Sequence, residues 1–174
     1  DKWQPLTPKR KVAVGEIEVV PHNSGHVLGS YEFEVATPDG SVLFTGDFNT
    51  EYRKTMTPAE PVECDILILE ATFGSPHFVF PTEDAVARKM VDWAKETLKR
   101  RRIPTFQADA LGNAQEIIRI FNESTDIPIV THRKVSRINE VYNSYGYKLE
   151  YIDMETIEAC EVISSREAVL ITLK

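Results

Sequence analysis

The chain has few cysteines, few histidines, no long apolar run and no excess of positive charge. Two cysteines in 174 residues, Cys64 and Cys160, favour buried, reduced thiols over a disulfide framework. No apolar run approaches the roughly 20 residues that a membrane helix needs, and no signal peptide is visible. We therefore expect a soluble, cytoplasmic protein without a membrane partner.

The charge balance restricts how this chain could bind nucleic acid. The formal net charge is −7, which is the opposite of what a protein with a broad basic surface shows. Any contact with a phosphate backbone must therefore be local. With 42% hydrophobic residues, the chain can bury the core of one domain or of two small ones.

Two short polar motifs flank a predicted β-hairpin in the first half of the chain. The first motif, HNSGHVLGS, covers residues 22–30 and leads into a predicted strand at residues 31–36. The return strand, at residues 41–45, leads into the second motif, TGDF, at residues 45–48. Apolar and polar residues alternate in the first strand, which is typical of a half-buried strand.

The turn between these strands decides which residues come together. Residues 38–40, with the sequence PDG, are a turn signal because glycine adopts the positive φ that tight hairpins need. If the last two of them form the loop, Glu32 lies opposite Asp47. His26 and Asp47 then leave the sheet at the same end.

A third predicted strand, at residues 64–69, ends in a second carboxylate, Glu70. An imidazole and carboxylates on glycine-containing loops at one sheet edge favour a metal site. Each residue also has a plainer interpretation. His26 could be a loop histidine bonded to the backbone, Asp47 an Asx-turn residue, and Glu70 the cap of the next turn.

The second half predicts a parallel sheet with helical cover, since strands alternate with helices. We expect a boundary in the connector at residues 74–81, with domains at residues 1–76 and 77–174. Thr82 is the expected N-cap of the first helix. The predicted elements are a helix at 82–100, a strand at 104–108, a helix at 114–122, a strand at 127–130, a helix at 135–145, a strand at 148–152, a helix at 155–161 and a strand at 169–173.

Two places in this second half are candidate phosphate contacts. Asn113 and Gln115 lie at the predicted start of a helix, where free backbone N–H groups attract anions. A simple strand-to-helix turn is the alternative. Arg133 and Lys134 follow a predicted strand, at the end where ligands of open α/β sheets gather.

The order of three motifs resembles a known family. G-H-x-L-G-S, then T-G-D, then E-A-T-F-G is similar to the middle portion of metallo-β-lactamase-fold nucleases of the β-CASP group. Residues 78–83 and 111–116 resemble archaeal members described as mRNA 3′-end processing factors or exonucleases. The resemblance implies an α/β fold in which part of a metallo-β-lactamase β-sheet is followed by a β-CASP-like parallel α/β domain.

The resemblance also implies roles for particular residues. His26 would bind zinc, and Asp47 would bridge two zinc ions as a catalytic metal ligand. Glu70, also expected to be catalytic, would orient a histidine that lies later in the family's sequences. Phe73 stands where many relatives have tyrosine, so no hydroxyl acts there.

The departures from the family are equally informative. The H-x-H-x-D-H hallmark is absent, and among the four histidines no two show H-x-H spacing. Two zinc ions need more protein ligands than His26 and Asp47 supply. We therefore expect a piece of a longer polypeptide that does not retain zinc and is inactive by itself.

Three classes of function stay open. The first is part of a zinc-dependent ribonuclease that acts on single-stranded RNA, as in mRNA 3′-end processing or RNA decay, with a DNA repair exonuclease acting on DNA as its close alternative. The second is a non-catalytic relative that binds nucleic acid or serves as a scaffold. The third is a metallo-β-lactamase-fold hydrolase of thioesters or lactams, ranked lowest because it leaves the α/β second half unexplained. A homodimer is an open possibility.

Overall fold

The computed structural model describes residues 5–174 and divides after Val79 into two compact units, unit 1 and unit 2. The sequence placed the boundary slightly earlier, between residues 76 and 77. In the described part of the chain, no helix combines the length and the apolar character needed to cross a membrane.

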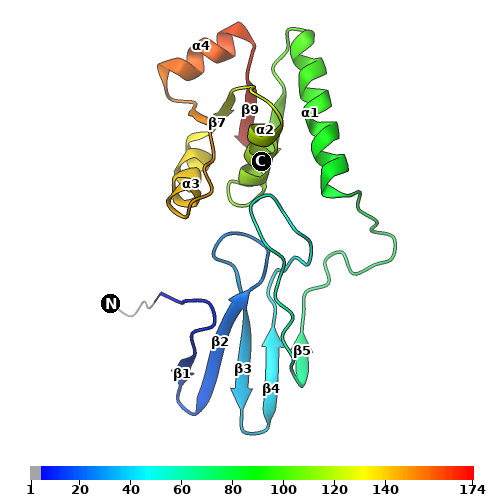
Figure 1. Cartoon of the computed structure of the whole chain (residues 1–174), viewed down its shortest axis with the longest axis vertical. Coiled ribbons are helices and arrows are strands. Elements are labelled where there is room, and N and C mark those ends of the chain that lie inside the picture. The colour runs from blue at the N-terminus through cyan, green and yellow to red at the C-terminus, as the bar shows by residue number, and fades with distance from the viewer. Residues whose placement is uncertain (1–4) are drawn as a thin grey trace. The chain divides into compact units, whose positions relative to one another are not determined.

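Unit 1 is built on a five-stranded sheet in which the strands lie side by side in chain order (Figure 1). Strands β1 to β4 pair antiparallel, and β5 pairs parallel to β4. The bounds are β1 Val12–Val14, β2 Ile17–Asn23, β3 Tyr31–Thr37, β4 Gly40–Phe44 and β5 Ile66–Ile68.

Strands β1 and β2 were not predicted, and β2 includes residues that the sequence assigned to the first motif. Pro21 lies within β2, paired with Phe33 of β3. Proline cannot donate a ladder hydrogen bond and is tolerated where a strand has a free side. The pairing of β1 with β2 ends at Val19, so Pro21 lies where that neighbour has stopped.

The predicted hairpin exists, but its turn is wrong by one residue. Thr37 pairs with Gly40, so Pro38 and Asp39 form the two-residue loop. Proline presets the φ of the second turn position, and glycine suits the fourth. Gly40 has a φ of 142°, and a Cβ there would stand 2.9 Å from Asp65 Oδ2.

The expectation of buried thiols is also wrong. Cys160 is exposed on helix α4, and Cys64 is half-buried in the segment before β5 rather than in the strand. Both cysteines are free, as predicted.

Unit 2 is a parallel α/β sheet of four strands in the order β6-β9-β7-β8 (Figure 1). Helix α2 packs against both α1 and α3. The bounds are α1 Glu83–Lys99, β6 Thr105–Ala108, α2 Asn113–Ser124, β7 Ile129–Thr131, α3 Arg133–Ser144, β8 Ile152–Asp153, α4 Ile157–Ser165 and β9 Val169–Leu173.

The predicted alternation of helices and strands in unit 2 is confirmed, and Thr82 caps α1 by accepting a hydrogen bond from the Ala85 amide. The strand predicted at residues 148–152 is wrong over most of its length. Side chains, not a neighbouring strand, bind this backbone: Asn143 Oδ1 accepts from the Leu149 amide and Asn122 Oδ1 from the Glu150 amide.

The core of unit 2 lies between the helices and the sheet. Ile118 and Phe121 of α2 and Val135 and Tyr142 of α3 are fully buried. The chain is therefore an α/β protein that combines a mixed, mostly antiparallel sheet with a parallel α/β sheet.

Candidate metal-binding site

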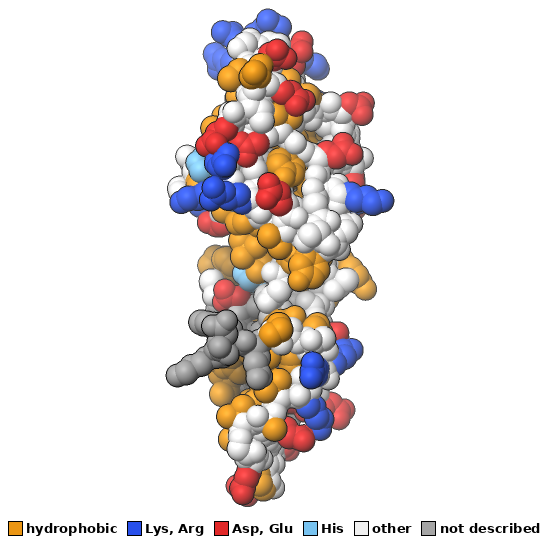
Figure 2. Space-filling view, turned by 90° about the vertical axis from the view of Figure 1, so that its left-hand side faces the viewer, with side chains coloured by type: hydrophobic (Ala, Val, Ile, Leu, Met, Phe, Trp, Pro, Cys, Tyr) orange, Lys and Arg blue, Asp and Glu red, His pale blue; other side chains and the backbone are white. Residues whose placement is uncertain are grey.

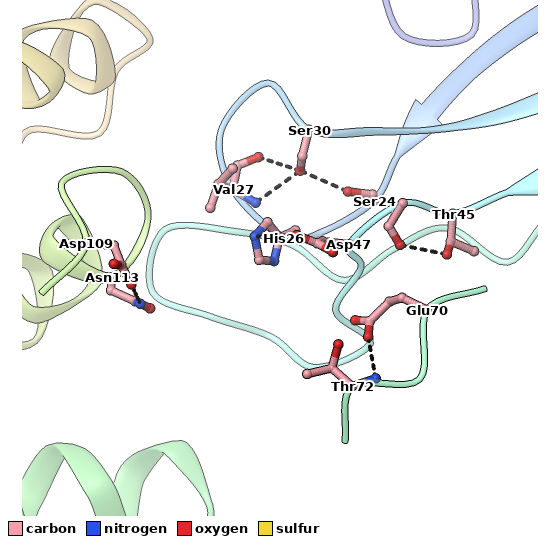
Figure 3. Close-up of polar contacts among 11 residues, drawn as sticks. Ser24, His26, Val27, Ser30, Thr45, Asp47, Glu70, Thr72, Asp109 and Asn113 are labelled. Carbon is pink, nitrogen blue, oxygen red and sulfur yellow. Dashed lines mark hydrogen bonds and ion pairs between the residues drawn. The ribbon is translucent and has the colours of Figure 1, made fainter. Parts of the chain in front are cut away.

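Two loops of unit 1 bring an imidazole and a carboxylate together. The histidine loop (residues 24–30) follows β2, and the aspartate loop (residues 45–60) follows β4. His26 Nε2 lies 3.8 Å from Asp47 Oδ2 (Figure 3). The side chains are 46% and 74% exposed, and an exposed pair of this kind adds about 1 kcal/mol or less to stability.

The histidine loop is organised around one hydroxyl group. Ser30 Oγ donates to the Val27 carbonyl at 2.7 Å and accepts from the Val27 amide and from Ser24 Oγ at 3.0 and 2.9 Å (Figure 3). Ser24 is fully buried. These bonds fix the turn that carries His26, while the imidazole remains accessible.

Asp47 is held by the turn that ends β4. The Thr45 amide donates to the Ile68 carbonyl at 3.0 Å, and Thr45 Oγ1 donates to the Gly46 carbonyl at 2.8 Å. Gly46 has a φ of 55°, which lets the chain leave the sheet edge at Asp47.

Glu70 follows β5 and lies near the same loops. Its Oε2 accepts a 2.8 Å hydrogen bond from the Thr72 amide, so it caps the following turn (Figure 3). Hydrogen bonds from the Thr72 backbone and hydroxyl hold the pKa of the Glu70 carboxyl below its usual range, with smaller contributions from the Phe48 amide and the His26 charge. Glu70 is therefore a carboxylate at neutral pH.

The two loops fit part of a metal site. Zinc bonds to imidazole nitrogen and to carboxylate oxygen are about 2.0–2.2 Å long. In a tetrahedral site, bonds of this length put the two donor atoms roughly 3.4 Å apart. The observed 3.8 Å between His26 Nε2 and Asp47 Oδ2 is close to this separation. Within residues 5–174, however, no group of three or more His, Cys, Asp or Glu side chains is arranged to hold an ion.

Two of the other three histidines make side-chain contacts within their own units. His22 Nε2 lies 2.9 Å from Glu34 Oε2, and its side chain is 13% exposed. His132 is the N-cap of α3, where its Nδ1 accepts from the Lys134 amide. The exposed His77 lies in the connector between the units.

Gln115, predicted to contact substrate, is instead fully buried. Its Oε1 accepts from the Gly112 amide at 2.8 Å, and its Nε2 donates to the Ala110 carbonyl and to Asn139 Oδ1 at 3.0 and 2.8 Å. Both amide protons are used, so the Gln115 side chain organises the start of α2 and does not face solvent.

The start of α2 is also less suited to phosphate than the sequence indicated. Asn113 Nδ2 donates to Asp109 Oδ2 at 2.9 Å, which puts a carboxylate at this helix terminus (Figure 3). Lys174 Nζ lies 3.0 Å from the same oxygen. The Asn113 and Ala114 amides donate to the Leu111 and Asp109 carbonyls.

Arg133 and Lys134 lie at the start of α3, and both are exposed. The Arg133 guanidinium is paired with the Glu155 carboxylate. Lys134 is therefore the better placed of the two cations for contact with an external phosphate.

Glu32 is a buried carboxyl group whose burial sequence reasoning did not recognise, because this burial depends on tertiary packing. It is 2% exposed on β3, and its Oε1 has no hydrogen-bond partner within the described part of the chain. Burial raises the pKa of the Glu32 carboxyl above its ordinary 4.5, although the neighbouring His22 opposes this shift.

The substitution Glu32→Gln is expected to stabilise unit 1 at neutral pH. Because the pKa of the Glu32 carboxyl is higher in the folded state than its unfolded value of 4.5, protonated Glu32 favours folding. This stabilising contribution is present below pH 4.5 and is lost as the pH rises through the higher pKa of the folded state. Burying an unsatisfied carboxylate costs more than burying a neutral amide, and we expect the difference to be about 1 kcal/mol, or roughly 5 °C in the melting temperature of a domain of this size. Thermal unfolding between pH 4 and 8 measures the effect.

The gain should vanish near pH 4, where Glu32 is protonated in the unsubstituted chain. Glu34→Gln is the matched control, since it removes the carboxylate that pairs with His22 and should not stabilise the protein. An equal gain at pH 4 and pH 8 contradicts this account of Glu32.

Comparison with known proteins shows which proteins this chain is similar to. No family model matches the chain. A protein named "Probable DNA ligase" from Opitutus terrae is 29% identical over 157 residues, which are 86% of this chain and 15% of that protein. The RNase J-like protein of Methanocaldococcus jannaschii is 33% identical over 132 residues, 71% of this chain and 31% of that protein.

Endoribonuclease ysh1 of Aspergillus fumigatus is 32% identical over 133 residues, 74% of this chain and 14% of that protein. The chain thus spans about a third or less of the length of these relatives. At about 30% identity over a segment, it is homologous to β-CASP metallo-β-lactamase nucleases of the RNase J-like and ysh1 types. The resemblance predicted from the three motifs is confirmed.

Proposed function

We propose that this chain is part of a zinc-dependent nuclease that hydrolyses RNA phosphodiester bonds, in mRNA 3′-end processing or RNA decay. The observation that supports it most is the convergence of His26 Nε2 and Asp47 Oδ2 at 3.8 Å, on two motifs that resemble those of that family. Unit 1 then corresponds to part of the metallo-β-lactamase domain, and unit 2 to the β-CASP domain.

In this proposal each residue has a defined role. His26 and Asp47 would be metal ligands, with Asp47 shared by both zinc ions. When bound, such ions lower the pKa of water and polarise phosphoryl oxygens. Glu70, held as a carboxylate by Thr72, orients a histidine supplied by another part of the complete protein.

The remaining ligands are proposed to come from parts of the natural protein outside these residues. The chain spans 31% of the RNase J-like relative. Strand β5 supports the idea of further packing, because Ile66, Leu67 and Ile68 are 57%, 51% and 49% exposed although they point alternately to both faces of the sheet. By itself, the 174-residue chain is proposed to be inactive.

The substrate is proposed to be single-stranded RNA, because the relatives include proteins named as ribonucleases. DNA is the alternative, favoured by the match to a protein named as a DNA ligase over 86% of this chain. On the face shown in Figure 2, Lys and Arg side chains form separate groups with acidic side chains among them. Phosphate contacts would therefore be local, with Asn113, Arg133 and Lys134 as candidates.

Zinc stoichiometry tests the proposal. The complete natural protein that contains this segment should hold close to two equivalents of zinc after dialysis and cleave RNA in a zinc-dependent way. The 174-residue chain should hold less than one equivalent and show no cleavage, because two converging donors bind an ion weakly. Metal analysis and a labelled-RNA assay measure both properties. A complete protein that holds no zinc would instead be a scaffolding relative.

A further inference from the structure

The aspartate loop does not simply leave the site, but folds back over the histidine loop. The Asn49 amide donates to the Ser24 carbonyl at 2.9 Å, and the Ala59 amide donates to the Asn49 carbonyl at 2.7 Å. The Glu60 amide then donates to the Asn23 carbonyl at 3.2 Å. Backbone hydrogen bonds thus join the two loops that carry the imidazole and the carboxylate.

One side chain bonds to both loops. Asn23, the last residue of β2, accepts a 3.1 Å hydrogen bond from the Gly25 amide through Oδ1. Its Nδ2 lies within hydrogen-bond distance of three acceptors on the aspartate loop: the Thr57 carbonyl at 3.3 Å, Thr57 Oγ1 at 3.1 Å and the Pro58 carbonyl at 3.0 Å. The Asn23 amide group therefore bonds to both of the loops that carry the predicted metal ligands.

The two loops also touch through their backbones. A Cβ on Gly25 would lie 2.5 Å from both the Ala59 nitrogen and the Asn49 oxygen. There is no space for a side chain at this crossing, so a shift of either loop is transmitted to the other. Asn23 lies immediately beside this crossing.

We propose that Asn23 is a positioning residue that sets the separation between the His26 imidazole and the Asp47 carboxylate. Its role at the metal rests on the proposed function, whereas its role in joining the loops rests on the hydrogen bonds alone. A group that orients metal ligands typically changes metal affinity by about 10- to 100-fold when it is removed.

Asn23→Asp is the sharpest variant, because the two side chains have the same shape. The carboxylate still accepts from Gly25 N–H, but its second oxygen then faces the Thr57 and Pro58 carbonyl oxygens. Two acceptors facing a carboxylate repel it, so residues 57 and 58 should separate from β2. A second variant, Asn23→Ala, removes the amide without adding charge.

Asn122 provides the matched control in unit 2. Its Nδ2 donates to the Glu150 carbonyl at 3.1 Å, and its Oδ1 accepts from the Glu150 amide at 3.0 Å. Asn122→Asp therefore disrupts an equivalent side-chain clamp on the backbone, in the unit that does not carry His26 or Asp47.

The test combines amide hydrogen exchange with a zinc titration of the 174-residue chain, both followed by NMR. Asn23→Asp is expected to speed exchange of the Asn49 and Ala59 amides at least about 10-fold. It should also weaken zinc affinity, read from the His26 ring signals, by about 10-fold. Asn122→Asp should change neither quantity.

The outcomes separate this inference from the function on which it rests. If the His26 ring of the unsubstituted chain does not respond to zinc, the metal role of Asn23 in this chain is contradicted, whereas the zinc content of the complete protein still tests His26, and the exchange rates still decide whether Asn23 joins the loops. If exchange is fast in Asn23→Asp but zinc affinity is unchanged, Asn23 is merely structural. Unchanged exchange in both Asn23 variants overturns the proposal completely.

Discussion

Asp47→Asn, introduced into the complete natural protein, is expected to lower zinc-dependent RNA cleavage by about 1,000-fold or more. The change preserves the shape of the side chain but removes the negative charge and one strong ligand oxygen. A metal ion contributes several kcal/mol to stabilising charge in the transition state, and each 1.36 kcal/mol changes a rate tenfold. Single-turnover cleavage of a labelled RNA measures the loss.

Folding should not account for this loss, because the Asp47 side chain is 74% exposed. Glu51→Gln is the matched control, since it neutralises another exposed carboxylate on the same loop. It should leave cleavage within about threefold of the unsubstituted protein. If Asp47→Asn retains comparable activity, Asp47 is not a metal ligand.

Gly25→Ala is expected to have the largest effect on the stability of unit 1, about 3 kcal/mol or more. Gly25 has a φ of 70°, and its added Cβ would meet the Ala59 nitrogen and the Asn49 oxygen at 2.5 Å. Both are backbone atoms that cannot rotate away. Chemical denaturation, followed by hydrogen exchange or NMR signals of unit 1, measures the loss.

Gly29→Ala separates the clash from the backbone strain. Gly29 lies on the same loop with a φ of 84°, but nothing lies within 4 Å of a Cβ built there. Only the left-handed backbone opposes alanine, at a cost of about 1–2 kcal/mol. Equal destabilisation by the two substitutions would mean that the loop crossing at Gly25 is not tightly packed.

The sequence was most informative where local patterns determine structure. The alternation in β3 and the PDG turn predicted the hairpin, and Thr82 was correctly predicted to cap α1. The turn was predicted one residue too late, which shifts the pairing of the two strands by two positions. Thr45 rather than Asp47 therefore extends opposite Glu32. A shift by an even number preserves the faces of a strand, so His26 and Asp47 still meet at one end.

Features that depend on distant segments could not be predicted. Gln115 follows a strand at a helix start, which favours a surface position, but Asn139 of the next helix binds its amide in the core. The close approach at Gly25 depends on the aspartate loop, more than 20 residues later in the chain, which leaves no local pattern. Strand β1 is short and mostly exposed, so it carries little apolar periodicity.

The most direct test of the central claim is an anomalous diffraction measurement at the zinc edge on crystals of the complete natural protein. The account predicts a zinc peak about 2.0–2.2 Å from a ring nitrogen of His26 and from a carboxylate oxygen of Asp47. A zinc-loaded, RNA-cleaving protein in which neither residue contacts the metal would contradict it.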